Sequence, residues 1–177
     1  SGDELLIEKY NDVYDDILCY KEIRDKLSAQ KKTRGEIRMN LPEPFILENS
    51  QGEIISIENR IQDESHEIIE ALMVLTNEVV AKTFFDLALP FVYRVHEDPP
   101  ATKVETLKTV LRQVGIDASG LDTEVTAKQM SDILESVRDT HLEPLINRQL
   151  LRSMAKAVYS HENIGHFGLV LNNYAHF

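Results

Sequence analysis

The chain has 177 residues, and its hydrophobic content of 42% is enough to form the core of one domain. The net charge of −11 argues against a general nucleic-acid coat protein, because binding to phosphates depends mainly on Lys and Arg, although it does not exclude a local site. The single cysteine, Cys19, excludes an intrachain disulfide and a Cys-x-x-Cys metal site, and it fits a reducing, cytoplasmic setting. No apolar run is long enough to span a bilayer and the N-terminus does not resemble a signal peptide, so no membrane contact is expected.

The first 60 residues predict helices followed by a β-hairpin. Apolar residues at spacings of three and four predict one long amphipathic helix, or two in sequence, over residues 3–32, ending near Gly35. Two short apolar runs, 45–47 and 54–57, flank Asn, Ser and Gly residues that suit a turn, which predicts a hairpin. Seven Lys and Arg residues lie within residues 21–38, and their simplest interpretation is a solvent-exposed helix face.

A long helix is predicted from Glu64 to Leu87, with Asp63 able to cap its N-terminus. Its apolar residues form two adjoining stripes, which predicts a core helix packed on more than one side. The stripes are Ile68, Leu72, Leu75 and Val79, and Ile69, Met73, Val80 and Phe84. Glu70 and Asn77 lie on a separate face, about 20° from each other around the helix. A carboxylate and an amide so placed can hold sugar hydroxyls or order a metal-bound water, whereas the simpler interpretation is a solvated polar face.

Residues 91–96 alternate in polarity as a half-buried strand does. In such a strand Arg94 and His96 share one face, and Tyr93 lies on the other. Arg94 can contact a phosphate and Tyr93 can stack on a base. More often, a strand of this kind simply has a polar outer face.

Three shorter helices are predicted in the second half of the chain, over residues 102–115, 126–137 and 144–158. The first two begin with the capping-box pattern, Thr102 to Glu105 in one and Thr126 to Gln129 in the other, and the third has Pro144 in its first turn. Residues 165–171 predict a turn that leads into a strand. The expected fold class is α+β, mostly helical, with a small hairpin and isolated strands.

General catalytic and metal-binding motifs do not occur in the sequence. The six histidines form no zinc pattern, and there is no HExxH, GxGxxG, Walker or GxSxG motif. Cys19 lies in the first amphipathic helix without a basic partner, so packing is the simpler interpretation than nucleophilic catalysis.

The C-terminal part of the chain closely resembles the catalytic (RNB) domain of the ribonuclease II/R family, and within it the bacterial ribonuclease R enzymes. The most specific blocks are 150–160, 162–169 and 174–177, and the segments 64–81 and 91–96 agree as well. The similarity extends from about residue 31 to residue 177, which implies an internal piece of that domain. Within residues 1–177 we expect an N-terminal helical part at about 1–33, a hairpin at about 44–58 and a helical core at about 63–160.

This resemblance implies a magnesium-dependent enzyme that degrades RNA from a single-stranded 3′ end and releases nucleoside 5′-monophosphates. Glu70 matches a family glutamate that contacts the 3′-terminal nucleotide. Asn77 and the turn that contains His166 and Phe167 match positions that support the active site. Met39 falls where the family often has a base-stacking Phe, so a thioether in place of a ring implies a weaker or different clamp on the base.

The family's catalytic groups are expected to be absent from this chain. The aspartate-rich metal-binding motif has no counterpart in the sequence, and the family's Ser-Pro-x-Arg-Arg segment would begin after Phe177. We therefore expect magnesium to serve the full-length enzyme, no metal to be bound by this chain, and no RNA cleavage by it alone. Surface left uncovered by missing parts favours self-association.

Two alternatives stay open. The chain can be a non-catalytic helical module that kept the same scaffold, with the basic stretch 21–38 as an RNA- or protein-binding surface. It can also be a small-molecule enzyme that uses Glu70 as a base, for which only the helix geometry argues.

Overall fold

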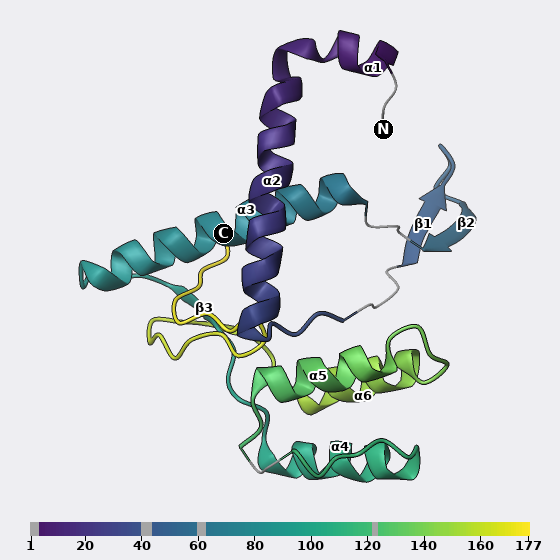
Figure 1. Cartoon of the computed structure of the whole chain (residues 1–177), viewed down its shortest axis with the longest axis vertical. Coiled ribbons are helices and arrows are strands. Elements are labelled where there is room, and N and C mark those ends of the chain that lie inside the picture. Colours follow the sequence, from purple (N-terminus) through teal and green to yellow (C-terminus); the bar gives the residue numbers. More distant parts are fainter. Residues whose placement is uncertain (1–3, 40–43, 60–62, 122–123) are drawn as a thin grey trace.

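The computed structural model describes residues 4–39, 44–59, 63–121 and 124–177. In chain order the elements are α1 (Glu4–Lys9), α2 (Asn11–Arg34), β1 (Pro44–Glu48), β2 (Ile54–Asn59), α3 (Glu64–Asp86), β3 (Tyr93–Val95), α4 (Ala101–Gln113), α5 (Ala127–Val137), α6 (Glu143–Ser153) and β4 (Val158–Ser160). The strands form two antiparallel pairs, β1 with β2 and β3 with β4 (Figure 1). The predicted α+β fold with mostly helical content is confirmed. Among the described helices, none is both long enough and apolar enough to cross a membrane.

The predicted N-terminal helix forms as two helices in sequence. α2 ends where Gly35 adopts a left-handed conformation with φ of 80°, and the Gly35 N–H donates to the carbonyls of Lys31 and Lys32. α2 crosses α3, while α1 and the first half of α2 extend away from the rest of the molecule (Figure 1).

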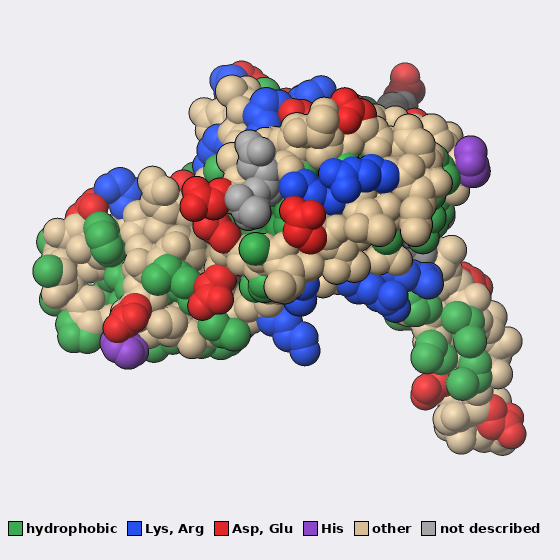
Figure 2. Space-filling view, turned by 90° about the horizontal axis from the view of Figure 1, so that it is seen from below, with side chains coloured by type: hydrophobic (Ala, Val, Ile, Leu, Met, Phe, Trp, Pro, Cys, Tyr) green, Lys and Arg blue, Asp and Glu red, His purple; other side chains and the backbone are tan. Residues whose placement is uncertain are grey.

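The predicted hairpin is also confirmed. Its strands pair with Ile46 opposite Ile57 and Leu47 opposite Ser56, and the register shifts after Leu47. Gly52 takes a positive φ of 79° in the turn. The hairpin projects as an arm, at the lower right of Figure 2, that carries hydrophobic and acidic side chains but no Lys or Arg.

Helix α3 has the predicted bounds, and Asp63 caps it by accepting the His66 N–H at 3.1 Å. The prediction that both apolar stripes are buried is wrong, because Ile69 is 67% exposed and Val79 is 54% exposed. The buried positions are Ala71, Val74, Asn77 and Ala81. These residues lie on the face of α3 that the sequence predicted for Glu70 and Asn77. Most of them are small, which lets β3 and the segment 171–175 approach α3 closely.

The main core lies among α4, α5 and α6, whose inward residues are almost fully buried. Its members are Val104, Leu107, Leu111, Ala118, Leu121, Val125, Met130, Ile133, Leu134, Val137, Ile146 and Leu150. The capping box at Thr126 forms, with Thr126 and Gln129 bonded reciprocally. The one at Thr102 does not, because α4 begins at Ala101 and Pro100 occupies the N-cap position, so Thr102 already lies inside the helix.

The third short helix ends earlier than predicted, at Ser153. Val158 instead opens β4 and pairs with Val95 of β3. The strand predicted within residues 165–171 does not form, since only isolated bridges join His166 to His96 and to Leu171. On the other side of β3, the backbone carbonyl of Tyr174 accepts a hydrogen bond from the Arg94 N–H at 2.8 Å.

Candidate functional site

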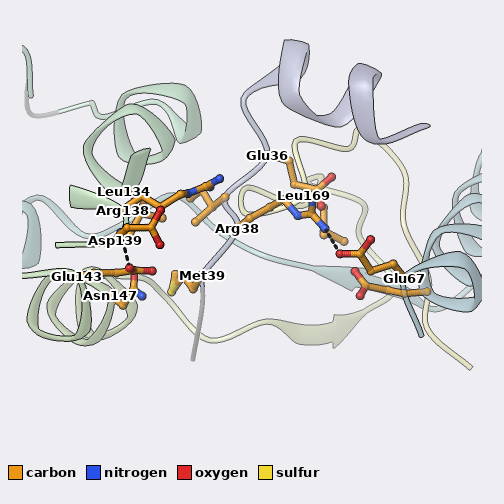
Figure 3. Close-up of a pocket in the computed structure, with 12 residues that line it drawn as sticks. Glu36, Arg38, Met39, Glu67, Leu134, Arg138, Asp139, Glu143, Asn147 and Leu169 are labelled. Atoms are coloured by element: carbon orange, nitrogen blue, oxygen red, sulfur yellow. Dashed lines mark hydrogen bonds and ion pairs between the residues drawn. The ribbon is translucent and has the colours of Figure 1, made fainter. Parts of the chain in front are cut away.

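A hollow of about 560 Å³ lies between α3 and the α5–α6 pair, and the extended segment 36–39 that follows α2 forms part of its wall (Figure 3). This size lies within the range of small-molecule and nucleotide sites. Its lining is mostly polar, and it comprises Glu36, Ile37, Arg38, Met39, Glu67, Glu70, Leu134, Arg138, Asp139, Glu143, Asn147 and Leu169. Two residues predicted from the sequence, Glu70 and Met39, are therefore brought together here.

Segment 36–39 is held in place from two sides. A Cβ at Gly35 would come within 2.6 Å of the Lys128 Cβ and 2.8 Å of its Cα, so a glycine is needed where α2 meets α5. Beyond it, Ser131 Oγ donates to the Glu36 carbonyl at 3.2 Å, and the Ile37 N–H donates to the Gly168 carbonyl at 3.0 Å. These contacts fix Arg38 and Met39 at the edge of the hollow.

Glu36 is a buried carboxylate beneath this segment. Its Oε1 lies 3.3 Å from Lys31 Nζ, and both residues are less than a tenth exposed. Burial raises the pKa of the Glu36 carboxyl, and the Lys31 ammonium offsets part of that rise. The pair therefore anchors the end of α2 and is not free to bind a ligand.

The α3 side of the hollow carries two carboxylates of different character. Glu67 is held by Arg24 of α2, whose Nη1 lies 2.7 Å from its Oε2, and Arg38 lies 4.0 Å from its other oxygen. Arg24 also contacts Glu64, so α2 and α3 are joined by charged side chains at their crossing. Glu70 is exposed and has no ion pair or hydrogen bond with any residue that the structure describes.

The opposite wall is built from the turn between α5 and α6 (Figure 3). Asp139 has a positive φ of 59°, and its N–H donates to a carboxylate oxygen of Glu143 at 2.8 Å. Arg138 pairs with Glu135 at 2.7 Å, and Asn147 is buried on α6. This wall therefore adds a cation and two acids to the hollow.

The remaining predicted site residues lie away from the hollow. Asn77 is only 3% exposed and its Nδ2 has no hydrogen-bond partner among the residues that the structure describes, so it does not share a solvated face with Glu70 as the sequence suggested. Tyr93 is 5% exposed and packs against Ala81 and Ala175, so it has no free ring face to stack on a base. Arg94 lies over the ring of Tyr159, 4.7 Å from its centroid.

His166 and Phe167 belong to a packed cluster of rings. His166 lies edge-on to His96 and to Tyr174, with centroids 5.0 and 5.3 Å apart, and its Nδ1 accepts the Leu169 N–H at 3.2 Å. Burial, together with the neighbouring His96, lowers the pKa of His166 to about 4. Phe167 packs against the α4–α6 core. This cluster holds the turn at 165–168, and the Gly168 carbonyl of that turn accepts the Ile37 N–H of segment 36–39. His166 and Phe167 therefore support the wall of the hollow without lining it.

Sequence analysis did not identify Arg38, Glu67 or the Asp139–Glu143 pair as parts of a site. Glu67 lies one turn before Glu70, so a search of α3 at spacings of three would have found it. Arg38 was counted with the basic stretch as a solvated face. The Asp139–Glu143 pair depends on the turn after α5, for which the sequence gives no signal.

Among the described residues, no three His, Cys, Asp or Glu side chains are grouped so that they could hold a metal ion. In the hollow, Arg38 and Arg138 lie among the acids, and two of the carboxylates already accept hydrogen bonds. The described residues therefore do not fit a magnesium site.

The sequence profile of the RNB domain matches residues 3–177, which is nearly the whole chain. The chain belongs to the RNB domain family. It is 33% identical to Ribonuclease R 1 of Lactococcus lactis over 177 residues, which is all of this chain and 22% of that protein. It is 35% identical to ribonuclease R of Aquifex aeolicus over 176 residues, which is 25% of that protein. The RNB chain thus spans about a quarter or less of the length of these relatives.

The fold also matches solved structures. The structure titled Mycoplasma genitalium RNase R in complex with double-stranded RNA superimposes with a TM-score of 0.89 at 27% identity, over 100% of this chain and 33% of that one. The same protein in complex with ribose-methylated single-stranded RNA gives a TM-score of 0.88 at 28% identity, over 93% of this chain and 26% of that one. The predicted family is confirmed.

Proposed function

We propose that this chain contributes the binding of the RNA strand, and not the cleavage chemistry, to a ribonuclease R-type 3′-to-5′ exoribonuclease. The observation that carries the proposal is the hollow itself, where the exposed Glu70, unpaired among the described residues, lies with Met39 within a mostly polar wall. A carboxylate accepts hydrogen bonds from the hydroxyls of a terminal ribose, which DNA lacks at the 2′ position. The RNA complexes of the Mycoplasma genitalium relative support RNA as the ligand.

The full-length enzyme is proposed to use magnesium and to release nucleoside 5′-monophosphates. Since the described residues do not fit a magnesium site, the chain by itself is proposed to be inactive. Incubation of a 5′-labelled RNA with the chain and Mg²⁺ should leave the RNA intact. Shortening from the 3′ end that EDTA abolishes would contradict this part of the proposal.

The binding role is tested with two RNA oligonucleotides that differ only in the 2′-hydroxyl of the terminal ribose. The wild-type chain should bind the complete RNA several-fold more tightly, and Glu70→Gln should reduce that preference. Glu8→Gln on the distant α1 is the matched control, because Glu8 is exposed and lies outside the hollow. Equal affinities of the wild type for both oligonucleotides would contradict the role of Glu70.

The alternative of a non-catalytic module that binds through the whole basic stretch 21–38 has less support. Most of its cations are already engaged, since Lys21 and Arg24 contact Glu64, Lys26 contacts Glu22 and Lys31 is buried against Glu36. Of the seven, only Lys32 has no polar partner among the described residues, and Arg38 has one contact at 4.0 Å.

Self-association of the isolated chain stays a prediction. Large hydrophobic side chains are exposed on α1, on the first half of α2, on the hairpin and on α3. Sedimentation velocity over a range of concentrations should show species larger than 20.2 kDa, and a monomer throughout would contradict it.

A further inference from the structure

We propose that a second hollow, between the end of α2 and α5, holds backbone phosphates of the RNA strand whose terminal ribose lies at Glu70. The inference rests on the proposed RNA-binding function and adds the route and the contact residues, Lys32 and Arg38. It predicts that the strand leaves the ribose site past Arg38 and runs toward Lys32.

The two hollows are neighbours that share three residues. The second hollow has a volume of about 380 Å³ and is lined by Ser28, Ala29, Lys32, Glu36, Arg38, Lys128, Ser131, Asp132, Glu135 and Arg138. Glu36, Arg38 and Arg138 also line the first hollow. Because Glu36 is buried, Arg38 and Arg138 are the exposed charged groups at the junction.

Two cations of the second hollow are not neutralised by its acids. Lys128 Nζ lies 2.9 Å from Asp132, and Arg138, just after α5, is paired with Glu135 at the end of that helix. The third acid, Glu36, is paired with the buried Lys31. Lys32 has no partner among the described residues, and the guanidinium of Arg38, 54% exposed, has only the 4.0 Å contact to Glu67.

The first hollow adds unpaired acids. Glu67 is engaged by Arg24 and Glu143 accepts the Asp139 N–H, so the acids that stay unpaired among its described residues are Glu70 and Asp139. Arg38 therefore lies between these free carboxylates and the free ammonium of Lys32.

This division matches the chemistry of a ribonucleotide strand. Its ribose hydroxyls donate hydrogen bonds, and its phosphodiesters need cations, for which the planar guanidinium of Arg is well suited. Over the body of the molecule that faces the viewer in Figure 2, Lys and Arg lie next to Asp and Glu. In a chain of net charge −11, binding through two cations should be weak and strongly dependent on salt.

The test measures the affinity of a labelled oligo(A) RNA by fluorescence anisotropy between low and moderate salt, with DNA of the same length for comparison. The variants are Lys32→Ala and Arg38→Ala, whose side chains are exposed, so the fold should be retained. Lys26→Ala is the control for the first, on the same helix but paired with Glu22, and Arg112→Ala is the control for the second, exposed at the end of α4.

Lys32→Ala and Arg38→Ala should each bind the RNA several-fold more weakly at low salt. Each should also flatten the slope of the logarithm of the binding constant against the logarithm of the salt concentration by about 0.7, the value for one phosphate contact on a single strand. DNA should lose as much as RNA, because the phosphates are common to both, and the two controls should match the wild type. If Lys32→Ala and Arg38→Ala both keep the wild-type slope while Glu70→Gln still lowers the preference for the terminal 2′-hydroxyl, the phosphate site in the second hollow is ruled out and the proposed function stands. Absence of RNA binding by the wild type at low salt would overturn both.

Discussion

The molecule has a packed part and an exposed part, and both contain large apolar side chains. In α4, α5 and α6 the apolar residues of each helix form one stripe, the stripes meet one another, and Leu111, Ile146 and Leu150 are fully buried. In α2 and α3 the apolar residues are spread around the helix, and Ile17 and Ile69 are exposed, as is Ile55 on the hairpin. The comparison teaches that apolar residues at spacings of three and four predict a helix, but that a concentrated apolar stripe is what accompanies close packing.

The candidate site lies where these two parts meet. Segment 36–39 is fixed to the packed part through Ser131 and Gly168, while Glu67 and Glu70 come from α3, whose apolar flanks are exposed. Charged contacts of Arg24 with Glu64 and Glu67 join α2 to the beginning of α3.

The difference in packing between the two parts is tested most directly by truncating one large side chain in each. Leu150→Ala should lower the free energy of unfolding by about 2–5 kcal/mol, because it leaves a cavity in a closely packed core. Ile69→Ala, at a site that is 67% exposed, should change it by no more than about 0.5 kcal/mol. Urea unfolding followed by circular dichroism measures both. Similar losses for the two variants would show that α3 is packed against a partner in solution.

A change of pH should affect the packed part through His166. Its pKa is about 4 in the folded protein against 6.5 for a free side chain, so the stabilisation is fully present above pH 6.5 and is lost as the pH falls toward 4. At about 1.4 kcal/mol per pH unit the upper bound is roughly 3 kcal/mol, and solvent screening of the partly exposed ring should reduce the loss to about 1–2 kcal/mol.

Urea unfolding at pH 7.5 and 4.5 checks this, with His166→Gln expected to remove much of the pH dependence. The exposed His161→Gln is the matched control and should behave as the wild type does. An unchanged pH dependence in His166→Gln would contradict a half-buried, neutral His166.

Two Lys–Glu pairs that involve lysines of α2, one buried and one exposed, sharpen the comparison. Glu36→Gln should cost about 1–3 kcal/mol, because it leaves the buried Lys31 ammonium without its counter-charge. Glu22→Gln disrupts the fully exposed pair with Lys26 and should leave the free energy of unfolding close to that of the wild type.

The pH dependence of Glu36 has the opposite sign to that of His166. Since burial raises its folded pKa, wild-type stability should fall as the pH rises from its ordinary value of 4.5 to the folded pKa. Glu36→Gln should lack this contribution, and a variant that kept it would assign the titration to another group.

Asn77 is expected to show the smallest effect. Its Nδ2 is buried without a hydrogen-bond partner, so Asn77→Ala removes an unsatisfied group and should leave stability within about 1 kcal/mol of the wild type, with a gain as the expected direction. Differential scanning calorimetry measures this. A loss of more than about 2 kcal/mol would show that the amide is bonded in solution.

Local signals in the sequence predicted most of the elements but not their neighbours. The ends of α2 and α3, the hairpin and the capping box at Thr126 follow from caps, turns and periodicity, which act within a few residues. The strand β4 was missed because it exists only through its pairing with β3, which is distant in sequence. The burial of Tyr93 and Asn77 was missed for the same reason.

The site was predicted in part. Glu70 and Met39 came from similarity to the family, and the structure places them in one hollow. Arg38 and Asp139 could not be assigned from the sequence, because their place depends on how the end of α2 and the α5–α6 turn meet in space.

Photo-crosslinking tests the central claim most directly. An RNA that carries 4-thiouridine at its 3′ end is irradiated with the wild-type chain, and the attached peptides are identified by mass spectrometry. The account predicts attachment within 36–39, 67–70 or 138–147, around the hollow that holds Glu70. Attachment confined to the exposed hairpin at 44–59 or to α1 would contradict it.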